Sequence, residues 1–286
     1  MSGYVHADIL AGRYRENAML LVVDIGNTNI VAALFKDSVP IHLGRIYTDP
    51  KRTGDEYSIV FRSLLRDNGI LPAQIRASVV SSVVPALIGP FLGMIEGLIG
   101  KKALLVNHAL YHLLPVKIPE SRARQIGTDI VCNVLEAYSR FRGACIVVDF
   151  GTALSFAAVG RQGNLLGTAI TPGLGIAVQS LVSHTAQLPP VALEAPESPL
   201  GANTVDAIQS GIVLGYKGLV ESLIAQFKDE MRRLEGISPE DVRVIATGGL
   251  NSVLSPITNV FQCVDRQLTL YGLKRIADLA AAPSLD

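Results

Sequence analysis

The sequence predicts an α/β protein with two similar lobes, because one strand–turn–strand motif occurs twice and helical patterns alternate with strand patterns. The first copy covers residues 20–35, where an apolar run leads into Asp24, a short polar turn and a second apolar run. The second copy, over residues 147–159, places Asp149 at the same point. A single copy would indicate only a hairpin. Two copies at matching places favour two lobes that face each other across a cleft.

The other segments complete an α/β order in each half. The first half is expected to contain a strand at 41–47, a helix at 55–68, a strand at 77–84, a helix at 85–99 and a strand at 102–106. The second half is expected to contain helices near 130–138 and up to 182, a helix at 205–234, a strand at 242–246 and a helix at 268–282. We therefore predict an N-terminal extension (1–18), a first lobe (19–126) and a second lobe (127–286). Glycines along 205–234 fit packing within the chain or a dimer seam equally well.

Composition limits the partners of this 286-residue chain. It carries 25 Lys and Arg against 25 Asp and Glu, so no net charge attracts nucleic acid or a membrane surface. The longest apolar stretch, 79–99, is interrupted by polar residues and prolines, and residues 1–18 lack the apolar core of a secretory signal. Three widely spaced cysteines indicate buried thiols in a reducing compartment. We therefore expect a cytoplasmic protein without nucleic-acid or membrane partners.

The turn after the first strand has the residues that a phosphate site needs. Gly26 lets the backbone approach an anion closely, so that successive N–H groups and the Thr28 hydroxyl point toward it. Asp24 would repel this anion unless a cation lay between them, which favours a divalent metal. Neither a P-loop nor a Rossmann glycine pattern follows, so we expect the turn at the tip of a hairpin.

Two later segments also suit a nucleotide site. Thr128 and Asp129 precede a helical pattern, and as an isolated observation helix capping explains them best. An Asp at the start of a helix that links two lobes also lies where a bound alcohol reaches it, and in phosphoryl transfer such an Asp accepts the proton of the hydroxyl. Gly248 and Gly249 follow a buried strand, where backbone can lie against a flat ligand such as adenine.

Nine motifs cover nearly the whole chain from residue 20. In chain order they are DIGNTNIVAALF, RIYTDPKRTGDEY, SSVVP, IGTD, VVDFGTA, TPGLG, TAQLPPV, GANTVDAIQSGIVLGY and ATGGL. As a set they resemble the type III pantothenate kinases, a family that includes Bvg accessory factor homologues. The resemblance implies the acetate-kinase/sugar-kinase/Hsp70/actin (ASKHA) fold with two ribonuclease H-like lobes. It also implies a homodimer that transfers the γ-phosphate of ATP to pantothenate, the first step of coenzyme A synthesis.

The resemblance implies Mg²⁺ and a monovalent cation, K⁺ or NH₄⁺, as cofactors, and it assigns a role to each matching residue. The phosphates of ATP would be held by Asp24 (through Mg²⁺), Ile25, Gly26, Asn27, Thr28, Asn29, Ile30 and Val31. The remainder of ATP would contact Thr152, Gly248 and Gly249. Asp129 would be the general base, and Asp149 would bind the monovalent cation. The pantothenate pocket would be lined by Gly127, Thr128, Asp129, Ile130 and Thr204, the last of which can come from the partner subunit in this family.

Three departures from the family pattern alter this assignment. Ile130 stands where the family has an Arg, which removes a cationic contact to the pantothenate carboxylate of about 1.5–3 kcal/mol. Residues 118–120 replace a segment that carries a Tyr in the family. Leu154 and Ala157 replace a Thr and an Asp.

The departures leave two alternatives to an active pantothenate kinase. One is a kinase for a related small alcohol. The other is a nucleotide-binding accessory or regulatory protein with weak or no kinase activity. The retained acidic residues favour the active kinase, and we hypothesise that Arg122 or Arg124 replaces the missing cation.

Overall fold

The structure is a computed structural model that describes residues 19–36 and 38–282. The predicted extension at 1–18 lies outside the described residues. The described chain divides into two compact units, the described residues of 19–136 with 269–282 and residues 137–268.

The first unit is built on a five-stranded sheet with the order β3-β2-β1-β4-β5. Its strands are β1 (Met19–Ile25), β2 (Asn29–Lys36), β3 (Val39–Tyr47), β4 (Ile75–Ser82) and β5 (Leu104–Leu105). Its helical elements are α1 (Gly54–Asp67), α2 (Pro85–Ile99), η3 (His108–Leu113), α3 (Glu120–Ala123), the start of α4 (Thr128–Phe141) and most of α9 (Leu268–Ala281). The first three strands form an antiparallel meander, whereas β4 pairs with β1 in parallel. The predicted order of elements in this half is confirmed.

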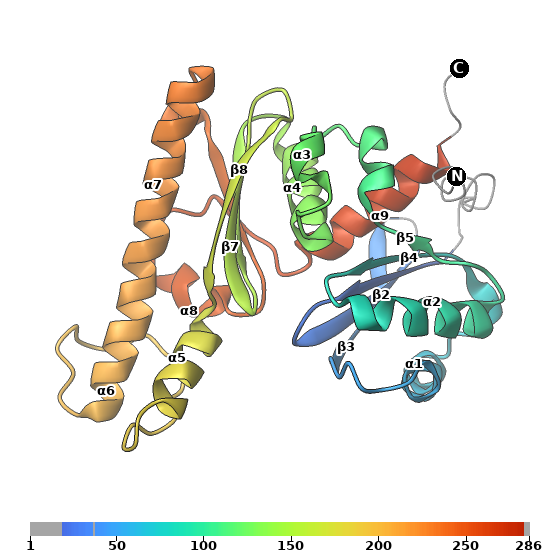
Figure 1. Cartoon of the computed structure of the whole chain (residues 1–286), viewed down its shortest axis with the longest axis horizontal. Coiled ribbons are helices and arrows are strands. Elements are labelled where there is room, and N and C mark those ends of the chain that lie inside the picture. The colour runs from blue at the N-terminus through green and yellow to red at the C-terminus, as the bar shows by residue number, and fades with distance from the viewer. Residues whose placement is uncertain (1–18, 37, 283–286) are drawn as a thin grey trace. The chain divides into compact units, whose positions relative to one another are not determined.

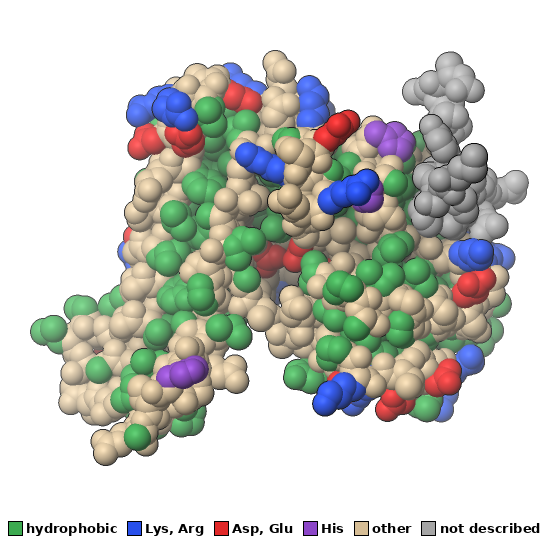
Figure 2. Space-filling view, in the orientation of Figure 1, with side chains coloured by type: hydrophobic (Ala, Val, Ile, Leu, Met, Phe, Trp, Pro, Cys, Tyr) green, Lys and Arg blue, Asp and Glu red, His purple; other side chains and the backbone are tan. Residues whose placement is uncertain are grey.

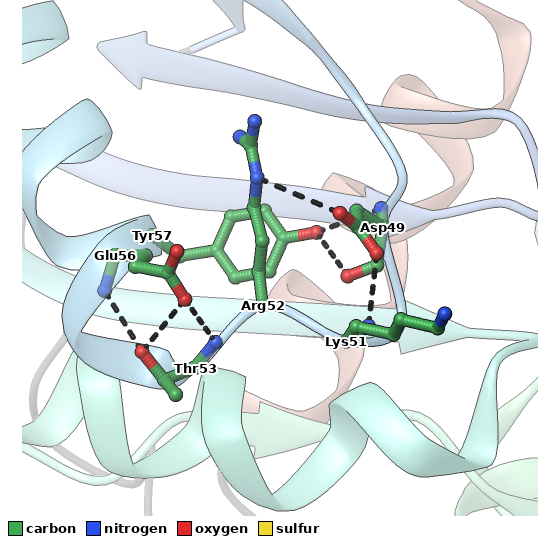
Figure 3. Close-up of polar contacts among 6 residues, drawn as sticks. All are labelled: Asp49, Lys51, Arg52, Thr53, Glu56 and Tyr57. Atoms are coloured by element: carbon green, nitrogen blue, oxygen red, sulfur yellow. Dashed lines mark hydrogen bonds and ion pairs between the residues drawn. The ribbon is translucent and has the colours of Figure 1, made fainter.

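One face of this sheet is covered by α1 and α2, which lie together on one side of it in Figure 1. Alternate residues of β1, such as Val23, pack with Phe61 of α1 and Phe91 of α2 in a single buried cluster. A capping box starts α1: the Thr53 hydroxyl accepts from the Glu56 N–H, and the Glu56 carboxylate accepts from the Thr53 N–H (Figure 3).

The helices α4 and α9 pack closely against each other in the first unit. A Cβ atom on Gly272 would lie 2.1 Å from the carbonyl oxygen of Cys132, so only glycine fits there. Nearby, Arg275 Nε lies 2.7 Å from a carboxylate oxygen of Glu136. This contact ties the C-terminal helix to the helix that begins at Thr128.

We expect Gly272→Ala to lower the free energy of unfolding by about 1–3 kcal/mol, because the added methyl group forces α9 away from α4. Gly97→Ala, at an exposed site of α2 where a Cβ meets nothing within 4 Å, is the matched control. It should raise stability by about 0.5–1 kcal/mol through helix propensity. Urea unfolding of both variants checks the prediction, and equal stabilities would contradict it.

The second unit repeats this architecture with the order β10-β9-β6-β7-β8. Its strands are β6 (Cys145–Phe150), β7 (Ala153–Val159), β8 (Leu165–Pro172), β9 (Arg243–Thr247) and β10 (Cys263–Val264). Its main helices are α5 (Leu174–Ser183), α6 (Thr204–Gln209), α7 (Gly215–Glu235) and α8 (Asn251–Leu254). When β6 is matched to β1, the two sheets have the same strand order and the same mixture of parallel and antiparallel pairs. The predicted fold class, two duplicated α/β lobes, is confirmed.

The long helix α7 covers one face of the second sheet (Figure 1), with Val220, Ile224 and Met231 in the buried cluster. We expected one helix over 205–234. The structure instead has a π-helical segment at Ser210–Leu214 between α6 and α7.

The division by packing does not coincide with the predicted lobe limits. The described residues up to 136 and helix α9 belong with the first sheet, since α4 and α9 pack on each other there. The two compact units are defined by which residues contact one another, whereas the predicted lobes are defined by the repeated strand–turn–strand motif. The limits 19–126 and 127–286 therefore remain a prediction.

Candidate active site

In the first unit, the carboxyl end of β1 meets the start of α4. Asp24 is half-buried and lies in register with Ser81 of the parallel strand β4. The Ser81 hydroxyl lies 2.9 Å from the Thr128 hydroxyl, which is also 3.4 Å from the carbonyl oxygen of Ser82. Thr128 is the first residue of α4, and its hydroxyl joins that helix to the strand end beside Asp24.

Asp129 is held by its own backbone at the start of α4. Its Oδ1 accepts a 2.8 Å hydrogen bond from the Ile130 N–H. A Cβ atom on Gly127 would lie 2.3 Å from this oxygen, so the glycine provides the space that the carboxylate occupies. The position of the carboxylate is therefore fixed by the local sequence Gly-Thr-Asp.

Burial raises the pKa of the Asp129 carboxyl above its ordinary value, although hydrogen bonds from backbone N–H groups oppose this. One turn along α4, burial raises the pKa of the Cys132 thiol, and the charges of Asp24 and Asp129 raise it further. Both carboxylates therefore lie within electrostatic range of the same thiol. A carboxylate with a raised pKa is a stronger proton acceptor, which suits Asp129 to general base catalysis.

The predicted phosphate-binding turn is the tip of the hairpin between β1 and β2. Ile25 pairs with Ile30 at its base, and both side chains are fully buried, so only their backbone is open to a ligand. The Gly26 N–H donates to the Asn29 carbonyl at 3.1 Å. At the tip, Asn27 and Thr28 are exposed, whereas Asn29 and Val31 are half-buried.

The buried residue Thr48 fixes this turn. Its hydroxyl donates to the Gly26 carbonyl at 2.7 Å, and its N–H donates to the Thr28 carbonyl at 3.0 Å. The next residue, Asp49, is tied to the buried Tyr57 of α1 (Figure 3): the Asp49 N–H donates to the phenol oxygen, and the phenol donates to the Asp49 carbonyl, both at 3.0 Å. The turn is thus connected to the core through two successive residues.

On the phosphate-binding role that the resemblance implies for this turn, we expect Thr48→Val to raise the KM for ATP about three- to tenfold, because the Gly26 carbonyl loses its donor and the turn loosens. Thr269→Val removes a comparable hydroxyl, bonded at 2.8 Å to Asn133, far along the chain in the same unit. Steady-state kinetics should show the ATP effect in the first variant only. A similar KM change in both variants would contradict this role of Thr48.

In the second unit, Asp149 lies at the carboxyl end of β6, in register with Thr247 of β9. Gly248 follows with φ +86°, and a Cβ atom there would lie 2.6 Å from both Asp149 Oδ1 and the Phe150 carbonyl oxygen. The Asn251 side-chain amide donates to the Gly248 carbonyl. This glycine turn therefore closes over the carboxylate, and Gly249 beside it is exposed.

The turn after β6 is equally tight. Thr152 is exposed, and its carbonyl accepts from the Gly173 N–H at 3.0 Å. A Cβ atom on Gly173 would lie 2.4 Å from the Gly151 carbonyl oxygen. The carboxylate of Asp149 and these backbone oxygens are hard donors of the kind that bind alkali and alkaline-earth cations.

Thr204 begins α6 and is exposed. It lines an apolar cavity of about 480 Å³ within the second unit, together with Leu181, Leu188, Gly201, Ala202, Asn203, Ala207, Ile208, Gly211 and Ile212. The Asn203 side chain caps this helix by accepting from the Asp206 N–H at 3.0 Å. Around α5 and α6, the face in Figure 2 is mostly apolar or uncharged, whereas charged side chains gather at the far end of α7.

The departures from the family pattern fall in different surroundings. Leu154 and Ala157 are buried in the second sheet, so their exchange changes the core rather than an exposed site. Ile130 is half-buried beside Asp129, and Arg122 and Arg124 are exposed in and after α3.

No three His, Cys, Asp or Glu side chains in the described part of the chain are grouped to hold a metal ion. Mg²⁺ that is bound mainly by nucleotide phosphates requires only one or two protein carboxylates. Asp24, half-buried beside the turn, fits that requirement. Among the described helices, none has the length and apolar character needed to cross a bilayer.

Two sheets of the same strand order, each with an Asp at the carboxyl end of its first strand, define the ASKHA class of two-lobed, nucleotide-using proteins. The family model for type III pantothenate kinase matches residues 20–226. The chain therefore belongs to the type III pantothenate kinase family.

Curated relatives agree with this family. The type III pantothenate kinase of Geobacter sulfurreducens is 38% identical over 256 residues, which cover 90% of this chain and 97% of that protein. That of Treponema pallidum (strain Nichols) is 39% identical over 264 residues, with 91% and 94% covered. A crystal structure from Campylobacter jejuni, described as a putative Baf family transcriptional activator, has the same fold with TM-score 0.54 and 18% identity, covering 90% of this chain and 97% of that one.

The structure groups the predicted site residues by unit. One group lies in the first unit, where the carboxyl end of β1 meets the start of α4: it contains Asp24, the turn after it, Thr128 and Asp129. A second group lies in the second unit and contains Asp149 and Gly248. Thr204 lines its own cavity in the second unit. Sequence reasoning missed Thr48 and Ser81, although both lie in quoted motifs, RIYTDPKRTGDEY and SSVVP.

Proposed function

We propose that this kinase transfers the γ-phosphate of ATP to the primary hydroxyl of pantothenate, the first step of coenzyme A biosynthesis. The observation that carries the proposal is that Asp24 and Asp129 lie in the same region of the first unit, where the carboxyl end of β1 meets the start of α4. A half-buried carboxylate with a raised pKa, Asp129, shares electrostatic surroundings with Asp24 in a chain of this family.

In the proposed reaction, Asp129 accepts the proton of the pantothenate hydroxyl as its oxygen forms a bond to the γ-phosphorus. The bond between that phosphorus and the β,γ-bridging oxygen breaks, and ADP leaves. The N–H groups and the Thr28 hydroxyl of the turn from Ile25 to Val31 bind the phosphates. Asp24 would hold Mg²⁺, which offsets phosphate charge when it is bound.

The remaining roles are proposed by position. Asp149, with its neighbouring carbonyl oxygens, would bind K⁺ or NH₄⁺, and Thr152, Gly248 and Gly249 would contact ATP. Gly127, Thr128, Ile130 and Thr204 would line the pantothenate pocket.

We further propose that the enzyme is a homodimer in the cytoplasm. The exposed residues Leu200 and Val205 lie close in sequence to Thr204 and the apolar cavity, which supports a subunit contact at this end of the second unit. Three free thiols fit a reducing compartment.

The test is a coupled ADP-release assay with Mg²⁺ and K⁺ and two acceptors, pantothenate and pantothenol, which lacks the carboxylate. Turnover of pantothenate supports the proposal. Because apolar Ile130 lies beside Asp129, a preference for pantothenol would favour the second candidate, a kinase for a related neutral alcohol. Reduced pantothenate affinity after Arg122→Ala or Arg124→Ala would support a replacement cation, and no change in either would exclude it.

A further inference from the structure

Arg45 is an exposed arginine of β3 to which the proposed reaction assigns no role. Its place follows from the register of the first sheet, in which Asp24 pairs with Val31 of β2 and Val31 pairs with Arg45. The three residues therefore form a row across three neighbouring strands. This row lies at the end of the sheet that carries the predicted phosphate-binding turn.

The Arg45 side chain points to the same face of the sheet as the Asp24 carboxylate, because residues that pair directly across strands share a face and successive residues alternate. The neighbours of Arg45 agree with this orientation. Ile46 packs against the buried cluster under α1 and α2, and a Cβ atom on Gly44 would lie 2.7 Å from the Leu64 side chain of α1. Both neighbours thus face α1 and α2, and Arg45 faces the other way.

Arg45 lies within reach of an anion bound beside Asp24. Neighbouring strands are about 4.8 Å apart, so two strand spacings separate the backbones of the two residues by about 10 Å. A long arginine side chain covers much of that distance. Arg45 also has no hydrogen bond or ion pair with any residue in the described ranges 19–36 and 38–282, so its guanidinium is available to a ligand.

The second unit shows that the fold does not require an arginine at this position. There, Asp149 pairs with Ser155 of β7, and Ser155 pairs with Ile170 of β8. Ile170 thus occupies the position that matches Arg45, and its uncharged side chain is 66% exposed. Of the two equivalent rows, only the one beside the predicted phosphate-binding turn carries a cation.

We propose that Arg45 binds the terminal phosphates of ATP, with its guanidinium donating hydrogen bonds to oxygens of the β- or γ-phosphate. This inference deepens the proposed function and rests on it. A guanidinium presents its N–H donors in a planar fork that suits phosphate oxygens. ATP carries more negative charge than one divalent cation offsets, and the Asp24 carboxylate adds to the repulsion. A second cation in the same row of the sheet reduces that repulsion.

Isothermal titration calorimetry of Arg45→Gln with ATP and Mg²⁺ tests the proposal without a turnover assay. We expect the Kd for ATP to rise about ten- to a hundredfold, the effect of one lost charged hydrogen bond. The Kd for AMP, which lacks the terminal phosphates, should stay within twofold of wild type. The Tm should match wild type, because the side chain is exposed.

Arg76→Gln is the matched control. Arg76 is an exposed arginine of the same sheet, and its neighbour Ile75 pairs with Met19, at the opposite end of β1 from Asp24. This variant should bind ATP with wild-type affinity. An equal loss of ATP affinity in both variants would show a general effect of surface charge and would overturn the proposal.

Other results would also overturn it. A Kd for ATP within twofold of wild type in Arg45→Gln refutes the contact, and a raised KM for pantothenate beside it would assign Arg45 to the acceptor carboxylate instead. Equal losses for ATP and AMP identify a residue that only shapes the site. A wild-type protein that does not bind ATP contradicts this inference and the proposed function together. Wild-type ATP binding without turnover of pantothenate refutes the proposed acceptor alone.

Discussion

We expect Asp129→Asn to lower kcat for pantothenate phosphorylation about 10²- to 10⁴-fold, the range typical of the loss of a general base. The amide has nearly the same shape as the carboxylate and can still accept from the Ile130 N–H, so the start of α4 should be preserved. It cannot take the proton of the attacking hydroxyl. ATP affinity, measured by isothermal titration calorimetry, should stay within twofold of wild type.

The pH dependence follows from the same group. Because burial raises the pKa of Asp129, kcat/KM should fall as the pH decreases through that raised pKa, at a higher pH than for an exposed Asp. The folded state binds this proton more tightly than the unfolded state, so the contribution of Asp129 to stability decreases as the pH rises between the two pKa values. Asp129→Asn should therefore be at least as stable as wild type at pH 7.

Two results would refute this assignment. If Asp129→Asn retained more than a tenth of wild-type kcat, another group would have to accept the proton. If the variant unfolded at a markedly lower Tm at pH 7, its lost activity would reflect damage to the fold.

Gly248→Ala has the second large expected effect, a loss of about 2–5 kcal/mol in the free energy of unfolding and at least a tenfold loss of ATP affinity. The residue has φ +86°, where an L-residue costs about 1–2 kcal/mol. The new methyl group would also lie 2.6 Å from Asp149 Oδ1 and from the Phe150 backbone, and this overpacking adds about 1–3 kcal/mol.

Gly236→Ala separates these two causes. Gly236 ends α7 with φ +65°, but a Cβ atom there meets nothing within 4 Å. It should lose only about 1–2 kcal/mol and keep wild-type ATP affinity. Equal losses of stability in both variants would show that the carboxylate is not tightly enclosed by the Gly248 turn.

The repeated hairpins could be predicted because apolar runs broken by Asp and Gly are local signals. The strand β10 could not, since two residues carry no periodicity and their pairing with β9 is set by tertiary packing. The π-helical segment after α6 was missed for a related reason. Its wider turn depends on packing around Ser210 and Val213, which are both buried, and no residue type marks it.

A candidate site residue could be predicted from the sequence where the residue type, within its motif, by itself indicates a role. Asp24, Asp129 and Asp149 were predicted in this way, and their roles remain predictions. The supporting contacts join Thr48 to the turn after β1 and Ser81 to the start of α4, 22 and 47 positions away in sequence, so they required the packing of these elements. Helix α9 packs on α4 across more than 130 residues of sequence, which periodicity alone cannot indicate.

The most direct test of the account is identification of the product after incubation with γ-labelled ATP, Mg²⁺, K⁺ and pantothenate. We predict that the label appears in 4'-phosphopantothenate with the wild-type enzyme and is absent from it with Asp129→Asn. Label found only in inorganic phosphate, or label in phosphopantothenate at equal rates with both proteins, would contradict the proposed role of the Asp24 and Asp129 cluster.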